Sequence, residues 1–281
     1  ARFIRRRDSA TSPVNFVPCR CVIYREDTRS FVDDHPLRRR FDQDAVVPVS
    51  NPGNHIQLSV SSVFFRRSNI EAAVLRFDVR VKPCFEDAHF VARYMMRCNG
   101  GTLGFVRGAR YYYRKRADKS STLDTSAESP ERFDDLYRYG YCALLQEARE
   151  RLGAAPRWLQ RTVLYDVVWQ IRRHIDHEER LAFLDDRQLE TYKSLLTEVF
   201  KHIDSSTIAR FELAGIRDLH RVGLLGTYKS VHNKRSFCFI NWLDAERGEF
   251  ELRWYSSRAA THAEIRIDGV VVVPLEAKQQ V

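Results

Sequence analysis

The stretch at residues 83–96 reads PCFEDAHFVARYMM, and it decides the local fold of the first half of the chain. Its apolar and aromatic side chains at positions 90, 91, 94 and 95 are three and four residues apart, the spacing of an amphipathic helix. Glu86 and Asp87 come just before them, where the positive end of a helix favours acidic side chains. The stretch therefore predicts a helix over 86–96 with two carboxylates at a strand-to-helix corner.

The segments around this helix predict a mixed α/β region. Residues 57–65, QLSVSSVFF, alternate polar and apolar side chains and predict a strand. Residues 104–106 and 109–116 predict a further strand-rich pair. From 118 to 130 the composition shifts to Ser, Thr, Asp and Pro, which is typical of a solvated connector.

The period changes after the connector. Helices are predicted over 132–152, 158–174, 186–202 and 207–213. Period-two runs follow, and an Asp-Gly pair between β-branched runs at 268–269 predicts a hairpin. The predicted fold class is α/β, followed by an α-helical module and a small antiparallel β module, with boundaries at 1–128, 129–225 and 226–281.

Composition limits the classes of protein. The chain has 281 residues, 44% of them hydrophobic, and a formal charge of +9 from 46 Lys and Arg against 37 Asp and Glu. This composition excludes collagen-like and low-complexity chains, and at about 150 residues per domain it predicts more than one domain. The basic balance points to anionic partners such as nucleotide diphosphates, headgroups, phosphate polymers or nucleic acid. The sequence carries no signal of oligomeric state.

The sequence has no recognisable secretory or membrane-spanning signal, which favours the cytoplasm. No apolar run approaches the roughly 20 residues that cross a bilayer, so no membrane span is predicted. The start, ARFIRRR, is basic without an apolar core behind it, and it lacks an initiator Met, so a processed chain or a fragment is expected. The six scattered cysteines are expected to be reduced. A cytoplasmic location is predicted, with peripheral contact to the inner face of the membrane as an option.

The Glu86-Asp87 pair is the sharpest candidate for chemistry. Adjacent carboxylates place one side chain on each side of the backbone, so one can face a cleft while the other packs or caps. A base that takes a proton from a sugar hydroxyl needs such a fixed, half-buried seat. The ordinary alternative is an acidic residue that caps the helix.

A basic aromatic stretch gives a second candidate. Residues 111–116 read YYYRKR, and Ser120 and Ser121 follow in a predicted turn. If the stretch is extended, Arg114 and Arg116 share one face and can grip a diphosphate, because guanidinium groups pair with phosphate oxygens in a bidentate manner. The alternative is an exposed strand with solvated charges. The same two alternatives apply to the arginine runs at 38–40 and 172–173.

Several runs in the same order and spacing resemble one enzyme family, namely those at residues 57–60, 64–67, 75–78, 85–90, 112–116 and 120–122. They resemble the distal half of family 2 glycosyltransferases of the GT-A fold. The likeness is greatest to bacterial enzymes of capsule and wall teichoic acid polymer synthesis, in which this domain is often fused to a CDP-glycerol glycerophosphotransferase-like domain. Residues 156–169 are similar to the helical segment that follows, so the resemblance covers about residues 35–175.

The resemblance implies roles for several residues. Asp87 becomes the catalytic base, with Glu86 beside it as an acceptor or orienting contact. Arg114 and Arg116, with Ser120 and Ser121, are expected to bind the donor diphosphate. His89 and Gln57 fall on the acceptor side, although a capping or packing role for His89 is the alternative. The implied partners are a nucleotide-sugar donor and a polysaccharide or polyol-phosphate acceptor.

The chain departs from the family in its first half. There, a nucleotide-binding unit ends in an Asp-x-Asp motif that holds a divalent cation, Mg²⁺ or Mn²⁺. Only about 35 residues precede the matching region, so the donor half and its metal motif are expected to be missing. Asp42-Gln43-Asp44 has the letters but lacks a preceding buried strand, and Asp33-Asp34 falls in a predicted loop. A base cannot act without a positioned donor, so this chain alone is expected to be incomplete.

The sequence as a whole predicts a portion of an inverting glycosyltransferase that acts on a cell-surface polysaccharide or teichoic-acid-like acceptor. The alternative from another class is a non-catalytic module that binds an anionic polymer, either a wall polymer or nucleic acid. Nucleic acid is disfavoured, because basic and acidic residues are interleaved and no RNA-binding or helix-turn-helix signature is present.

Overall fold

The computed structural model describes residues 4, 8, 12–98, 100–118, 126–175, 177–231, 237–255 and 264–273. The chain forms two compact units, residues 1–216 and 217–281, and each is described by itself. The predicted division at 128 and 225 stays a prediction. The predicted class is confirmed: mixed sheets with helices, and a small antiparallel β part.

A four-stranded mixed sheet forms the base of the first unit. Its strand order is β4-β6-β1-β5; β1 pairs in parallel with β6, and the other two pairs are antiparallel. The bounds of these strands are Val14–Pro18 (β1), Ala45–Pro48 (β4), Val63–Phe65 (β5) and Thr102–Phe105 (β6). Every residue of β1 is buried, as expected for a central strand.

A second, three-stranded sheet continues from the first. It has the order β3-β2-β7, in which β2 pairs in parallel with β7 and antiparallel to β3. The bounds are Arg20–Arg25 (β2), Ser30–Val32 (β3) and Arg110–Lys115 (β7). Because Cys19 alone separates β1 from β2, one extended run of chain serves both sheets. The prediction that residues 109–116 are extended is confirmed.

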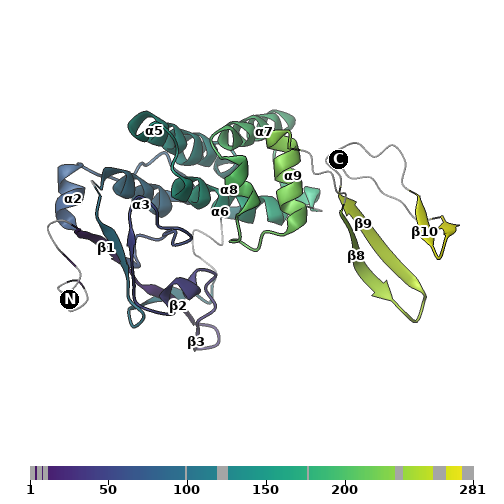
Figure 1. Ribbon diagram of the computed structural model, residues 1–281, viewed down its shortest axis with the longest axis horizontal. Coiled ribbons are helices and arrows are strands. Elements are labelled where there is room, and N and C mark those ends of the chain that lie inside the picture. The colour runs from purple at the N-terminus through teal and green to yellow at the C-terminus, as the bar shows by residue number, and fades with distance from the viewer. Residues whose placement is uncertain are drawn as a thin grey trace. The chain divides into compact units, whose positions relative to one another are not determined.

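Helix α3, Glu86–Arg97, packs on the first sheet (Figure 1). The rings of Phe65 and Tyr94 meet edge to face at 4.9 Å, and those of Phe77 and Phe90 stack at 4.7 Å. The predicted helix over 86–96 is confirmed, because its apolar side chains recur on the face that meets the sheet. The short helix α2, Arg67–Ala72, precedes it.

The predicted strand over 57–65 is wrong for its first six residues. Only Val63–Phe65 forms a strand, and the residues before it form a loop. The side-chain amide of Gln57 donates to Ser59 O at 2.6 Å and to Ser62 Oγ at 3.0 Å. Such local side-chain bonds compete with ladder pairing, so the alternation of residue types did not become a strand here.

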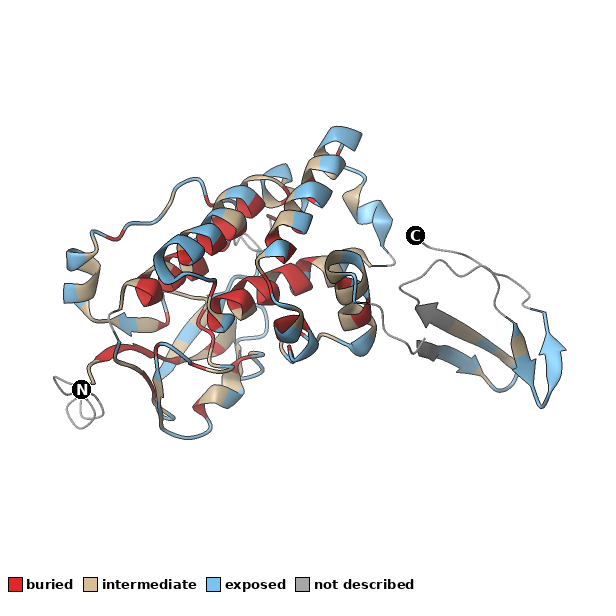
Figure 2. Cartoon of the chain, turned by 45° about the horizontal axis from the view of Figure 1, so that its top comes forward, coloured by how far each residue is buried: buried red, intermediate tan, exposed pale blue. Residues whose placement is uncertain are grey.

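Helices complete the first unit, and their buried faces meet in a common core (Figure 2). The predicted helix over 132–152 begins later and opens with a π-helical segment, in which the buried rings of Tyr137 and Tyr141 pack edge to face at 4.9 Å. The bounds are Leu136–Cys142 (η4), Ala143–Leu152 (α5), Arg157–His174 (α6), Asp186–Lys201 (α7) and Ser205–Ala209 (α8). Short 3-10 turns occupy Arg38–Phe41, Ser126–Glu128, Pro130–Arg132 and Glu178–Leu181.

The second unit holds helix α9, Asp218–Lys229, and two hairpins. Strands β8, Phe237–Asp244, and β9, Glu249–Tyr255, pair antiparallel. Strands β10, Ile265–Ile267, and β11, Val270–Val272, flank Asp268-Gly269, whose φ angles are both positive. Positive φ at both central residues is the requirement of a type I′ turn, and the predicted Asp-Gly hairpin is confirmed. Within the described residues, no helix is both long and apolar enough to cross a bilayer.

Candidate functional site

The two carboxylates lie in the first turn of α3. Phe85, the residue before the helix, adopts a left-handed conformation with φ of 74°, and its ring packs edge to face on Tyr141 at 4.9 Å. A non-glycine residue in this region costs of the order of 1–3 kcal/mol, and such residues cluster at functional sites. The backbone therefore turns sharply just before Glu86 and Asp87, held there by packing against the helical layer.

Asp87 is half-buried and is held from one side. Its Oδ2 accepts a hydrogen bond from the backbone N–H of Val60 at 2.9 Å. Across the part of the chain that the structure describes, its Oδ1 accepts no hydrogen bond. One oxygen thus orients the carboxylate, and the other is left able to take a proton. This is the geometry that a general base requires.

Gln57 holds the loop that supplies the Val60 N–H. It is buried, and its carbonyl oxygen accepts a hydrogen bond from Arg40 Nη2 at 2.5 Å. Burial lowers the pKa of Arg40 to about 9, and the guanidinium also faces the rings of Phe41 and Phe105. Gln57 is therefore a positioning residue for Asp87, and its predicted acceptor contact stays a prediction. The sequence showed Arg40 only as part of a basic run.

Glu86 lies beside the base with a different environment. The residue is exposed, but neighbouring protein atoms partly desolvate its carboxyl group. This desolvation is the main cause that raises the pKa of Glu86 above its usual value. The neighbouring charge of Asp87 raises the pKa further. The pair thus combines the oriented carboxylate of Asp87 with the carboxyl of Glu86, whose pKa is raised.

His89 is a buried residue of α3, with 4% of its surface exposed. Desolvation is the main cause that lowers its pKa to about 4, and Arg93 adds to the effect. Within the described segments of the chain, its Nδ1 finds no hydrogen-bond partner. This burial favours the packing alternative, and the acceptor-side role of His89 stays a prediction.

The predicted diphosphate residues lie on the second sheet. Arg114 is exposed on β7, and its Nη2 forms an ion pair with Glu26 Oε1 at 2.5 Å, which raises the pKa of the guanidinium. Arg116 is exposed just beyond β7. Ser120 and Ser121 lie outside the described residues. The convergence of these groups on the Asp87 carboxylate stays a prediction.

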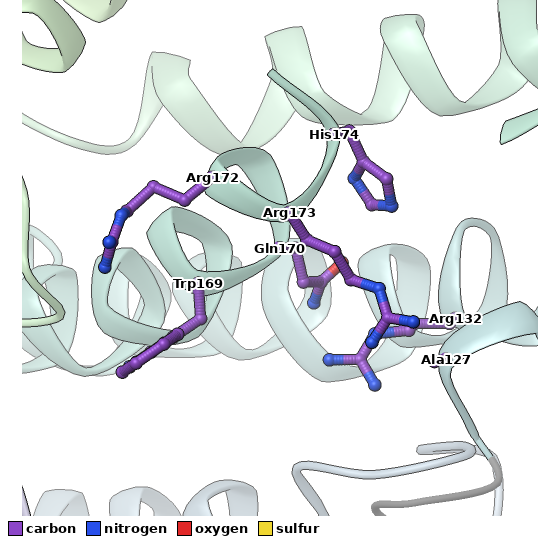
Figure 3. Close-up of a pocket in the computed structure, with 7 residues that line it drawn as sticks. All are labelled: Ala127, Arg132, Trp169, Gln170, Arg172, Arg173 and His174. Carbon is purple, nitrogen blue, oxygen red and sulfur yellow. The ribbon is translucent and has the colours of Figure 1, made fainter. Parts of the chain in front are cut away.

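A cationic pocket, here called the arginine pocket, lies on α6 (Figure 3). Its volume is about 350 Å³, within the range of small-ligand sites. Its lining residues include no acid and are Ala127, Arg132, Trp169, Gln170, Arg172, Arg173 and His174. Three guanidinium groups in one concavity make it attractive to anions.

The wall behind the pocket is fixed by a buried network. Gln170 Nε2 donates to Tyr141 Oη at 2.7 Å and to Asp166 Oδ2 at 3.2 Å, and the Tyr141 hydroxyl also donates to Asp166. Burial is the main cause that raises the pKa of Tyr141 well above its usual value. Because Asp166 is held by these donors, its charge is directed into the network.

One residue of the pocket and one of the carboxylate pair both affect the pKa of Cys84. Desolvation raises the pKa of the buried Cys84 thiol to about 12, and both Arg132 and Glu86 contribute electrostatically to that pKa. Cys84 precedes the left-handed Phe85 directly. The charges of Arg132 and Glu86 thus act in opposite directions on the pKa of the same thiol.

The aspartates that could suggest a metal site are engaged elsewhere. Arg20 pairs with Asp33 at 2.9 Å and lies 3.7 Å from Asp42, and Asp44 accepts from the backbone N–H of Arg107 at 2.8 Å. Among the described residues, no group of three or more His, Cys, Asp or Glu side chains could hold a metal ion. The donor set present therefore does not fit the divalent cation that the resemblance implies, and no chemical step is assigned to it.

Comparison with known proteins finds two similar chains. The minor teichoic acid biosynthesis protein GgaA of Bacillus subtilis (strain 168) is 26% identical, over 54% of this chain and 35% of its own length. GgaB of the same organism, also a minor teichoic acid biosynthesis protein, is 25% identical over 62% of this chain and 19% of its own length. The chain thus spans about a third or less of these relatives. No protein-family profile matches it.

Proposed function

We propose that this chain is the acceptor-side portion of an inverting glycosyltransferase of wall-polymer synthesis. The observation that carries the proposal is the seat of Asp87, whose Oδ2 is held by the Val60 N–H at the turn into α3. The names of the similar proteins, both of minor teichoic acid biosynthesis, support the polymer class. The GT-A likeness supports the reaction type.

In the proposed reaction, an acceptor hydroxyl transfers its proton to Oδ1 of Asp87 as its oxygen attacks the anomeric carbon. A new carbon–oxygen bond forms there, and the bond to the nucleotide diphosphate breaks with its electron pair leaving on the diphosphate oxygen. Attack and departure on opposite faces of the sugar give inversion. A positioned general base contributes about 10²- to 10⁴-fold to such a step.

The proposal divides the work between two parts. This chain supplies the base and the acceptor surface, and a donor-binding half places the nucleotide sugar. Arg114 is proposed to meet the diphosphate, which requires it to exchange Glu26 for a phosphate oxygen. The exposed position of the Arg114–Glu26 pair supports this exchange, because surface ion pairs are worth only about 0–1 kcal/mol.

Kinetics of carboxylate variants in the full-length natural protein test the base. Asp87→Asn keeps the hydrogen bond from Val60 but removes the proton acceptor, so turnover is expected to fall about 10²- to 10⁴-fold with little change in acceptor affinity. Glu86→Gln is the matched control and is expected to lose less. The configuration of the product, read by NMR, is expected to be inverted. Near-native turnover in Asp87→Asn would contradict the assignment of Asp87 as the base. A product with retained anomeric configuration would contradict the inverting reaction.

A further inference from the structure

Among the described residues, the lining of the arginine pocket carries positive charge and no acid. Its lining holds Arg132, Arg172 and Arg173 without a carboxylate. Across the described part of the chain, no acidic side chain forms an ion pair with any of the three. Fixed guanidinium groups that face a cavity without an internal counterion are suited to an anionic ligand.

Electrostatics at His174 show that these charges converge. Desolvation is the main cause that lowers the pKa of His174 to about 4, and the charges of Arg173, Arg132 and Arg180 lower it further. The imidazole is therefore neutral near pH 7. In Figure 3 the imidazole and the ends of Arg132 and Arg173 point into the same part of the pocket.

The opposite side of the pocket offers an aromatic surface. Trp169 is 43% exposed, although the residues spaced three and four apart before it on α6, Trp158, Thr162 and Tyr165, are buried. The guanidinium of Arg172 lies 5.3 Å from its ring centroid and donates to Ala214 O at 2.5 Å. Arg172 is thus anchored, which leaves Arg132 and Arg173 as the groups that can turn to a ligand. An exposed indole next to guanidinium groups suits a chain of alternating carbohydrate or polyol and phosphate units.

Two described acidic residues lie close in sequence to the lining, and neither forms an ion pair with a lining arginine. Asp166 accepts hydrogen bonds from Tyr141 and Gln170, and the carboxylate of Glu131 accepts from Ser129 Oγ. Arg132 itself donates from Nη1 to Ser126 Oγ at 3.0 Å, a neutral partner that leaves its charge intact.

We propose that the arginine pocket binds a phosphodiester group of the acceptor polymer, in the units that precede its reacting end. This inference rests on the proposed function for its acceptor, but the pocket itself stands apart from the base. A phosphoryl group is the shared chemistry, and the diphosphate of the donor nucleotide is its other possible source. The exposed indole of Trp169 in the same lining favours the acceptor polymer, whose phosphate groups alternate with carbohydrate or polyol units.

Binding of defined probes to the intact chain tests the pocket. Calorimetry compares a synthetic poly(glycerol phosphate) oligomer, uridine diphosphate and a neutral dextran. The variant Arg132→Gln/Arg173→Gln is expected to weaken oligomer binding by roughly tenfold or more, because two charge-assisted contacts are lost. Arg187→Gln/Arg210→Gln removes the same charge from exposed positions outside the pocket and is expected to bind as the native chain does.

The binding results distinguish the acceptor polymer from the donor diphosphate as the source of the phosphoryl group. Loss of oligomer affinity with unchanged diphosphate affinity supports the proposal. Loss of diphosphate affinity alone assigns the pocket to the donor and overturns it, and equal loss in the control pair reduces it to general charge and also overturns it. Circular dichroism checks folding. If the double variant does not fold, the exposed Arg173→Gln variant alone must weaken oligomer binding, and unchanged affinity there overturns the proposal.

Failure of the base assignment would be recognised separately. Asp87→Asn is expected to leave oligomer affinity unchanged, since Asp87 does not line the pocket. If Asp87→Asn keeps full turnover while the arginine variants lose oligomer binding, the base is wrong and the phosphodiester site stands. The reverse pattern removes the site and keeps the base.

Discussion

At the scale of single residues, His89 is buried in a form that resists protonation. Its neighbours are Arg93 on its own helix, Asp78 and Arg80 before the helix, and Glu147 on α5. The net effect of burial and these charges is a pKa of about 4 in the folded chain, against 6.5 for an ordinary His. A titratable group is thus buried in α3, two residues after the candidate base.

This depressed pKa predicts acid sensitivity of the fold. Between pH 6.5 and 4 the unfolded chain binds a proton at His89 that the folded chain does not, so stability falls as the pH falls through this window. The full effect is about 3 kcal/mol, from roughly 1.4 kcal/mol per pKa unit. Urea unfolding at pH 7 and at pH 4.5 measures it. His89→Phe is expected to reduce the loss, and an equal loss in that variant would show that other groups cause it.

At the scale of elements, the 57–62 loop connects a buried cation to the base. Arg40 donates to Gln57, Gln57 fixes the loop through Ser59 and Ser62, and the Val60 N–H orients Asp87. Because the guanidinium has buried Nε and Nη1 atoms without partners, its bond to Gln57 is the contact that compensates its burial.

Removal of this contact is expected to be costly. Gln57→Leu leaves the Arg40 charge buried without an acceptor, and a loss of about 3 kcal/mol in unfolding free energy is expected. Arg40→Met/Gln57→Leu replaces both partners by apolar groups and is expected to recover most of that loss. Urea unfolding of the two variants provides the comparison. If the double variant is as unstable as the single one, the buried charge is not the cause.

Much of the element pattern could be predicted from sequence, for identifiable reasons. The helix over 86–97 follows from apolar spacing, and the Asp268-Gly269 hairpin follows from the φ angles that those residues tolerate. The strand expected at residues 57–62 failed because Gln57 makes local side-chain bonds that no alternation of residue types reveals. The run at 172–173 could be flagged as a possible phosphate contact, but its meeting with Arg132 could not be predicted, because Arg132 lies in the 3-10 turn Pro130–Arg132 and reaches the pocket only through tertiary packing.

At the scale of the whole molecule, the candidate base and the arginine pocket belong to one compact unit, residues 1–216. Residues 217–281 form the other unit, with exposed apolar side chains on β8 and β11 such as Leu243 and Val271. The residues named for the candidate base and for the arginine pocket all come from the first unit.

Removal of the second unit tests this independence. A chain that ends at residue 216 is expected to unfold cooperatively, since its core lies within that unit, and to bind the poly(glycerol phosphate) oligomer with native affinity. Calorimetry and thermal unfolding measure the two properties. A folded truncated chain with lost affinity would show that the second unit holds part of the acceptor site.

In the proposed mechanism, one acceptor chain is held by the arginine pocket while its end is deprotonated by Asp87. The dependence of kcat/KM on acceptor length, measured in the full-length natural protein, tests it most directly. The native enzyme is expected to gain as phosphodiester units are added, Arg132→Gln/Arg173→Gln to lose that gain, and Asp87→Asn to be slow at every length. A length dependence that the arginine variant leaves intact, or turnover that survives Asp87→Asn, would contradict the account.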